Sequence, residues 1–270
     1  MIYFIQKNKG GVWLGNKIQN EEDIRSFAQK LHLLKLNSID SIFYEMLPLC
    51  GFGPTISFSR FLALQKKIVF ASHALINAYR INHQSLWGVD LEDSLLERSM
   101  YFENAIESYN KVADYVYLIL YFNFELYEVM DRKEIKSKED IVEISKKIKG
   151  KKYEEINEWL IKDIRTSNFA KQFSDYRDSV KEMRELANDI KHRGCIAIDG
   201  TGIRRNTRVT KVIEGHEIDI TDQVSEVKID IDEEIEKLVI IHQETLELQK
   251  ELFGVCAFQK QLKDFLEAHI

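Results

Sequence analysis

Proline is scarce in this 270-residue chain, and the only two, Pro48 and Pro54, both precede residue 57. Proline removes a backbone donor and breaks helices, so its absence from the remaining chain favours long helices. Cysteine is scarce as well: Cys50, Cys195 and Cys256 lie far apart, with no Cys-x-x-Cys spacing. This pattern argues against a structural zinc site and indicates free thiols in a reducing compartment.

Positive charge is in deficit, and the net charge of the chain is -6. An acidic chain is a poor non-specific binder of nucleic acid, so any such binding requires a local basic surface. Long apolar runs are missing too, and the opening run of residues 1–5 is too short for a signal peptide. We therefore expect a soluble, cytoplasmic protein without a membrane partner.

The most easily recognised catalytic and phosphate-binding motifs are absent. The chain has no Gly-x-x-x-x-Gly-Lys-Ser/Thr, Gly-x-Ser-x-Gly or His-Glu-x-x-His sequence. Gly10 and Gly11 lie between two short apolar runs and fit a hairpin turn better than a phosphate loop, because no long helix follows directly. The sequence also has no carboxylate-rich metal cluster, so we predict no metal ion and no cofactor.

Apolar periodicity typical of α-helices is what the chain does contain, with apolar residues three and four positions apart. It predicts helices that begin after Asn20 and that cover residues 61–79, 93–130, 153–164 and 169–191. A last long helix is predicted after Asp230 or Asp232, either of which can cap it. Residues 47–59, with both prolines and two glycines, are predicted to form a linker.

Short strands are predicted at two places. Residues 2–14 indicate an N-terminal hairpin, and residues 208–212 and 216–220 alternate as a two-stranded ribbon, to which 225–229 adds a third strand. We therefore predict a mainly α fold: a helical bundle with a small β-ribbon insertion, near 205–229, before the last long helix. Residues 1–56 are predicted to be an N-terminal extension of hairpin and helix, and residues 57–270 the bundle.

Three further features have two interpretations each. Aromatic residues crowd the second half of the 93–130 pattern, and we interpret them as core rather than as a base-stacking surface. The lysine-rich run 146–152 resembles a nucleic-acid patch, but we interpret it as a solvated surface of mixed charge. His242 lies on the apolar row of the last helix and is interpreted as a core histidine, although it could approach His192 if the two helices pack together.

The strongest candidate site lies at the end of the 169–191 helix. Arg184, Asn188 and His192 are four residues apart, so a helix places them along one stripe, and Arg193 follows on a neighbouring stripe. A neutral imidazole can take the proton from a ribose 2′-OH, which then attacks its own phosphate. The guanidinium of Arg184 or Arg193 can hold the phosphate oxygens, and Asn188 can orient the phosphate or the imidazole. Two protomers that meet along this stripe would supply the second histidine that such a reaction needs.

A basic segment follows this helix closely. Its four cations, with no acidic residue between the first and the last, are Arg204, Arg205, Arg208 and Lys211. In an acidic chain this is the clearest local concentration of positive charge. It predicts an RNA-binding surface.

Two segments of the chain resemble the HEPN superfamily. Residues 188–194, Asn-Asp-Ile-Lys-His-Arg-Gly, are similar to the signature helix of that superfamily, and residues 101–115 resemble the long core helix of a bacterial, largely uncharacterised subgroup. The resemblance covers roughly residues 60–253. It implies a helical bundle, a homodimer in which two Arg-(x4–6)-His motifs share one cleft, and cleavage of RNA without metal. HEPN proteins recur in toxin–antitoxin and phage-defence systems, so an antitoxin or regulatory protein is an implied partner.

The motif is incomplete in this chain. Asn188 and His192 match its Asn-x-x-x-His part, but Ala187 stands where the arginine is expected, and Arg184 lies too far from His192. Arg193 or Arg184 would have to replace the missing guanidinium. Two functions therefore stay open: a metal-independent endoribonuclease, and a catalytically inactive helical dimer that binds a nucleotide or a protein partner.

Overall fold

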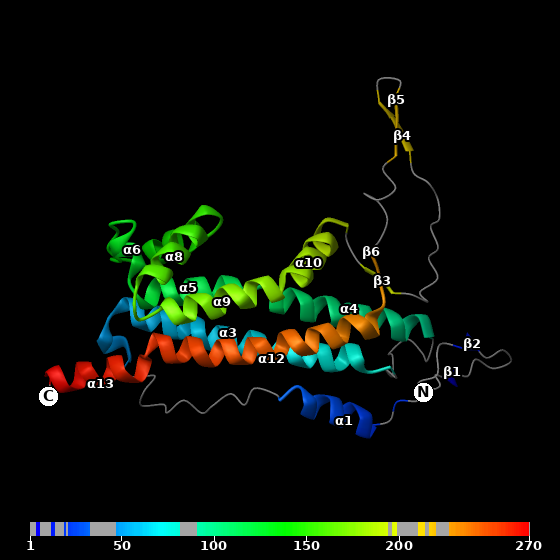
Figure 1. Cartoon of the computed structure of the whole chain (residues 1–270), viewed down its shortest axis with the longest axis horizontal. Coiled ribbons are helices and arrows are strands. Elements are labelled where there is room, and N and C mark those ends of the chain that lie inside the picture. Colours follow the sequence, from blue (N-terminus) through cyan, green and yellow to red (C-terminus); the bar gives the residue numbers. More distant parts are fainter. Residues whose placement is uncertain are drawn as a thin grey trace. The chain divides into compact units, whose positions relative to one another are not determined.

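The computed structural model is mainly helical (Figure 1). The residues that it describes are 4–5, 12–13, 19, 21–32, 47–81, 91–193, 196–198, 210–213, 216–219 and 227–269. Among their helices, none combines the length and the apolar character needed to cross a bilayer.

The helices follow the predicted periodicity, although several begin or end elsewhere. In the first half of the chain they are α1 (Glu21–Lys30), the 3-10 helix η1 (Leu47–Cys50), α3 (Phe52–Tyr79), α4 (Leu91–Asn110), α5 (Val112–Asn123) and α6 (Leu126–Val129). In the second half they are α7 (Lys138–Lys147), α8 (Lys151–Lys162), α9 (Ser167–Ser179), α10 (Lys181–Arg193), α12 (Ile231–Cys256) and α13 (Phe258–His269). Asp230 caps α12, because its Oδ1 accepts bonds from the backbone nitrogens of Asp232 and Glu233.

The strands are short and pair two by two. They are β1 (Phe4–Ile5), β2 (Val12–Trp13), β3 (Ile196–Ile198), β4 (Thr210–Ile213), β5 (His216–Asp219) and β6 (Val227–Ile229). The pairs β1–β2 and β4–β5 are antiparallel, whereas β3 and β6 are parallel, with Ala197 opposite Lys228. Most of the residues near 205–229 lie outside the described part, so the ribbon as a single inserted unit stays a prediction.

The linker predicted over residues 47–59 is wrong. Its residues form η1 and then the beginning of α3, which starts nine residues earlier than the apolar pattern indicated. Pro54 lies in the first turn of α3, where a backbone N–H has no partner within the helix, so its missing donor costs little. Gly53 is required here, because a Cβ at this position would lie 2.6 Å from the carbonyl oxygen of Phe122.

Two long periodic patterns are divided in the structure. The 93–130 pattern forms α4, α5 and α6, with breaks at Lys111 and at Phe124–Glu125, where Glu125 adopts a left-handed conformation. The 169–191 pattern forms α9 and α10, with a break at Val180. At this break the Ser179 hydroxyl donates to the Glu244 carboxylate of α12 at 2.5 Å, and its oxygen lies 2.9 Å from the backbone oxygen of Tyr176.

The chain divides into two compact units. Unit 1 contains residues Met1–Leu33, Phe70–Asn110 and Lys181–His242, and unit 2 contains Leu34–Val69, Lys111–Val180 and Gln243–Ile270. The helices α3 and α12 each contribute residues to both units. The predicted division into an extension of residues 1–56 and a bundle of residues 57–270 stays a prediction.

Unit 2 has an aromatic core. The α5 aromatics Tyr117, Tyr121 and Phe122 are buried, which confirms their interpretation as core. Hydrogen bonds tie the surrounding helices together: the Ser57 hydroxyl donates to the Ile119 oxygen at 2.9 Å, and the Tyr117 hydroxyl accepts from Arg177 at 2.7 Å. The α7–α8 turn belongs to this unit.

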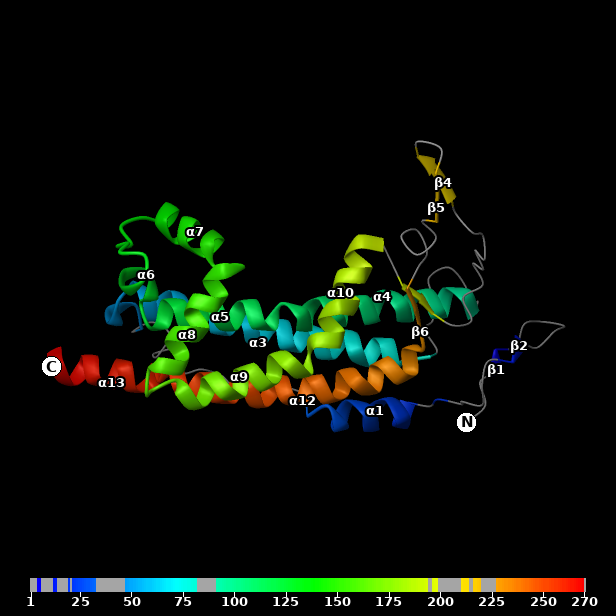
Figure 2. The same ribbon diagram turned by 45° about the horizontal axis from the view of Figure 1, so that its top comes forward.

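In unit 1, helix α1 runs along the first part of α12 (Figure 2). Phe27 of α1 stacks on Tyr79 with ring centroids 3.9 Å apart, and Lys30 forms an ion pair of 2.9 Å with Glu236 of α12. Unit 1 also holds α4 and α10, which are in contact with each other. The candidate site therefore belongs to unit 1.

Candidate functional site

Helix α10, which carries the candidate residues, loses burial along its length. Met183, in its first turn, is buried, whereas no described side chain from Arg184 to His192 is. Helix α10 contacts α4, and the C-terminal end of α10 rises away from α4 in both views (Figures 1 and 2). The end of the helix therefore presents its side chains to solvent.

The stripe of candidate residues lies on this helix as its spacing indicates. Asn188 and His192 are exposed and Arg184 is half-buried. None of these three side chains makes a hydrogen bond or an ion pair within the described part of the chain. At a rise of about 1.5 Å per residue, Asn188 lies about 6 Å and Arg184 about 12 Å along the axis from His192. Arg184 is therefore about two helical turns from His192.

The charge around the stripe is mixed. Lys191 is exposed beside His192, but Glu185 is exposed three residues before Asn188, and the half-buried Asp189 is three residues before His192. Glu185 is missing from the predicted site, although its helical spacing from Asn188 indicates that the two share a face. A carboxylate at this position repels a phosphate, so other groups of the protein must supply the positive potential that attracts an anionic ligand.

Other predicted site residues lie at the border of what is described. Arg193 is the last residue of α10, with its side chain outside the described part, and Lys211 lies on β4 opposite Ile218 of β5. Arg204, Arg205 and Arg208 lie outside the described residues altogether. Their predicted role in RNA binding stays a prediction.

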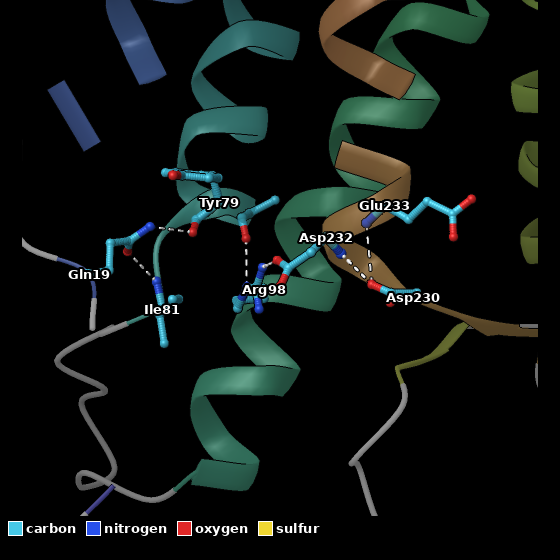
Figure 3. Close-up of polar contacts among 8 residues, drawn as sticks. Gln19, Tyr79, Ile81, Arg98, Asp230, Asp232 and Glu233 are labelled. Atoms are coloured by element: carbon cyan, nitrogen blue, oxygen red, sulfur yellow. Dashed lines mark hydrogen bonds and ion pairs between the residues drawn. The ribbon is translucent and has the colours of Figure 1, made fainter. Parts of the chain in front are cut away.

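A buried arginine fixes α4, the helix on which α10 packs (Figure 3). Arg98 of α4 is 3% exposed; its Nε donates to the backbone oxygen of Ala78, at the end of α3, at 2.7 Å. Its NH2 group forms an ion pair of 2.5 Å with Asp232, in the first turn of α12. This residue therefore joins three helices, and nothing in the local sequence pattern distinguishes it from a surface arginine.

Gln19 closes the same end of α3 (Figure 3). Its amide nitrogen donates to the backbone oxygen of Tyr79 at 2.9 Å, and its amide oxygen accepts from the backbone nitrogen of Ile81 at 2.8 Å. The two bonds satisfy backbone groups that a helix end leaves without partners. Gln19 is thus part of the packing of unit 1.

His242 lies in the core of unit 1, as its apolar surroundings predicted. It is 0% exposed, and its Nδ1 shares a hydrogen bond of 2.8 Å with the hydroxyl of Tyr109. Burial lowers the pKa of His242 to about 4, against the smaller raising effect of the Leu31 backbone. The imidazole of His242 is therefore neutral at pH 7. It has no access to a solvent-borne substrate, whereas the side chain of His192 is exposed.

The described residues contain no group of three or more His, Cys, Asp or Glu side chains that could hold a metal ion. No family model matches the chain, and neither curated proteins nor solved structures include a match.

Proposed function

We propose that the chain is an RNA-directed protein of the HEPN type, and that as a homodimer it cleaves RNA without metal. The observation that carries the proposal is the exposed pair Asn188 and His192 at the solvent-facing end of α10, with neither side chain used by the described part of the fold. Polar groups that the fold does not use, next to a basic segment, are available to a ligand. The resemblance of residues 188–194 to the HEPN signature supports the same assignment.

The chemistry follows from the side chains on this helix. A neutral His192 accepts the proton of a ribose 2′-OH as general base. The bond between that oxygen and phosphorus forms while the bond from phosphorus to the 5′ oxygen breaks, which leaves a 2′,3′-cyclic phosphate. The departing 5′ oxygen takes a proton from a second imidazole, supplied by the other protomer. Asn188 positions the phosphate between the two histidines.

The proposed reaction also needs a guanidinium that stabilises the negative charge on the phosphate oxygens. Either Arg184, about two turns before His192 on the same helix, or Arg193, which follows His192, would hold the phosphate oxygens. Arg204, Arg205, Arg208 and Lys211 bind the RNA backbone on either side of the cleaved bond.

A second function is favoured by a specific observation. Ala187 occupies the position of the expected arginine, and the exposed Glu185 brings negative charge to the same face. A dimer with these residues would keep the helical architecture and bind a nucleotide or a protein partner without cleaving RNA. The two functions differ in whether His192 has a chemical role.

Cleavage of labelled RNA in the presence of EDTA tests the proposal. His192→Ala removes the general base, and we expect it to lower the cleavage rate by at least about 100-fold. His73→Ala is the matched control, because His73 is also an exposed histidine of unit 1 but lies on α3. Equal rates for His192→Ala and the unchanged protein, or no cleavage by either, would overturn the nuclease proposal and favour the inactive dimer.

A further inference from the structure

The turn between α7 and α8 in unit 2 is rich in lysine. Five of the seven residues 146–152, which we call the lysine turn, are lysines, and no acidic residue interrupts them between Glu143 and Glu154. The backbone of the turn is tight: Lys149 donates to the oxygen of Lys147 at 2.9 Å, and Lys152 donates to that of Lys149 at 3.1 Å. Its charges are therefore held within a short distance.

Two of the five lysines serve the fold. Lys147 forms an ion pair of 2.8 Å with Glu143, one helical turn earlier. Lys152 forms ion pairs with Asp131 at 2.6 Å and with Glu155 at 2.8 Å. Lys133 also forms an ion pair of 2.7 Å with Glu143. Three lysines therefore balance these three carboxylates, which do not offset the charge of the rest of the turn.

The other three lysines of the turn have no such role. Lys146, Lys149 and Lys151 are exposed, and within the described part of the chain none of them forms an ion pair. Lys146 lies in the last turn of α7, where a cation suits the helix dipole, but Lys151 is the first residue of α8, where a cation is unfavourable. Helix stability therefore does not account for Lys151.

The shape of the turn indicates what kind of partner it fits. Adjacent Cα atoms are about 3.8 Å apart, so Lys146 and Lys151 are separated by at most about 19 Å, and each long side chain extends further. Ile148, the only large apolar residue of the turn, is 5% exposed, so no apolar group projects for insertion into a membrane. Three mobile point charges without an apolar neighbour match successive phosphates of an extended strand.

We propose that Lys146, Lys149 and Lys151 bind the phosphate backbone of a single-stranded nucleic acid. The strand is RNA if the function proposed above is correct, and the inference rests on that function only for this choice between RNA and DNA. This replaces our interpretation of residues 146–152 as merely a solvated surface. The acidic net charge of the chain makes such a local surface necessary for binding.

Fluorescence anisotropy with single-stranded RNA and DNA of one sequence tests the inference. The full chain carries His192→Ala so that the RNA stays intact, and EDTA is present. We expect K146A/K149A/K151A to weaken binding about tenfold at 0.1 M salt and to lower the slope of log affinity against log salt by about 2. The control K171A/K250A/K260A removes three exposed lysines of the same unit, and should leave binding unchanged.

The outcomes separate the two proposals. Equal affinity of the two triple variants for RNA overturns the lysine turn and leaves the nuclease proposal standing. A loss specific to the lysine-turn variant with DNA, together with no RNA binding, supports the turn and overturns the choice of RNA. Absence of binding to both strands overturns the inference. So does a lysine-turn variant that binds both strands normally and loses affinity only for anionic lipid vesicles, assayed in parallel.

Discussion

Two histidines of unit 1 show how strongly surroundings decide the role of one residue type. His242 is 0% exposed and bonded to Tyr109, and burial lowers its pKa to about 4. His192 is exposed at the end of α10. The buried imidazole is a neutral packing group, and the exposed one is the candidate for proton transfer.

The depressed pKa of His242 makes the folded state sensitive to acid. The unfolded chain binds the proton near pH 6.5 and the folded chain only near 4, so stability is complete above pH 6.5 and declines as the pH falls toward 4. The full effect is about 3 kcal/mol, at 1.36 kcal/mol per pKa unit. His242→Gln does not titrate and should lose this part of the pH dependence. Urea unfolding at pH 7 and pH 4.5 measures it, and parallel losses in both proteins would contradict the account.

Sequence reasoning worked well for residues whose role depends on local spacing. The buried α5 aromatics and the core position of His242 followed from helical periodicity. The capping preference of aspartate predicted Asp230 or Asp232 as the cap of α12, and the structure shows that it is Asp230. Arg98 did not, because the partners that bury it come from α3 and α12, which are distant in the sequence. A pattern within one helix carries no information about such partners.

At the scale of elements, the break between α9 and α10 places the candidate residues on a short helix of their own. The apolar spacing continues through Val180, so the sequence predicted one helix over 169–191, and the structure has two. The contacts of the Ser179 hydroxyl at this break, with Glu244 of α12 and with the Tyr176 backbone, depend on a side-chain rotamer and on a distant helix, which spacing does not reveal. The stripe from Arg184 to His192 survives because it lies entirely within α10.

The joint of α3, α4 and α12 at Arg98 leads to an asymmetric prediction. Asp232→Asn leaves the Arg98 charge buried without a counter-charge and should cost about 2 kcal/mol of unfolding free energy. Arg98→Met leaves Asp232, whose side chain is 35% exposed and can be solvated, and should cost about 1 kcal/mol. Urea unfolding of both variants measures the difference. A larger loss in Arg98→Met would show that the Ala78 carbonyl, rather than the ion pair, holds this joint.

At the scale of the whole chain, the two units are interleaved in sequence, since each is assembled from three separate segments. Apolar periodicity indicates which residues of an element are buried but not which elements share a core. The division into two units therefore could not be predicted from the sequence. The mainly helical class could be. The resemblance of two segments to one superfamily remains the basis for the proposed chemistry.

Charge is also organised at this scale. A chain with a net charge of -6 concentrates unpaired lysines at the lysine turn and arginines in the segment after α10. Under the proposed function, these local concentrations of positive charge bind nucleic acid although the average charge of the chain opposes it. The proposed function depends on these two local clusters of positive charge rather than on the net charge of the chain.

The nature of the RNA ends formed in EDTA tests the central claim most directly. If His192 activates a ribose 2′-OH, the 5′ fragments end in a 2′,3′-cyclic phosphate, the 3′ fragments begin with a 5′-OH, and His192→Ala forms neither. Fragments with 3′-OH and 5′-phosphate ends, or cyclic phosphate formed equally by His192→Ala, would contradict the account.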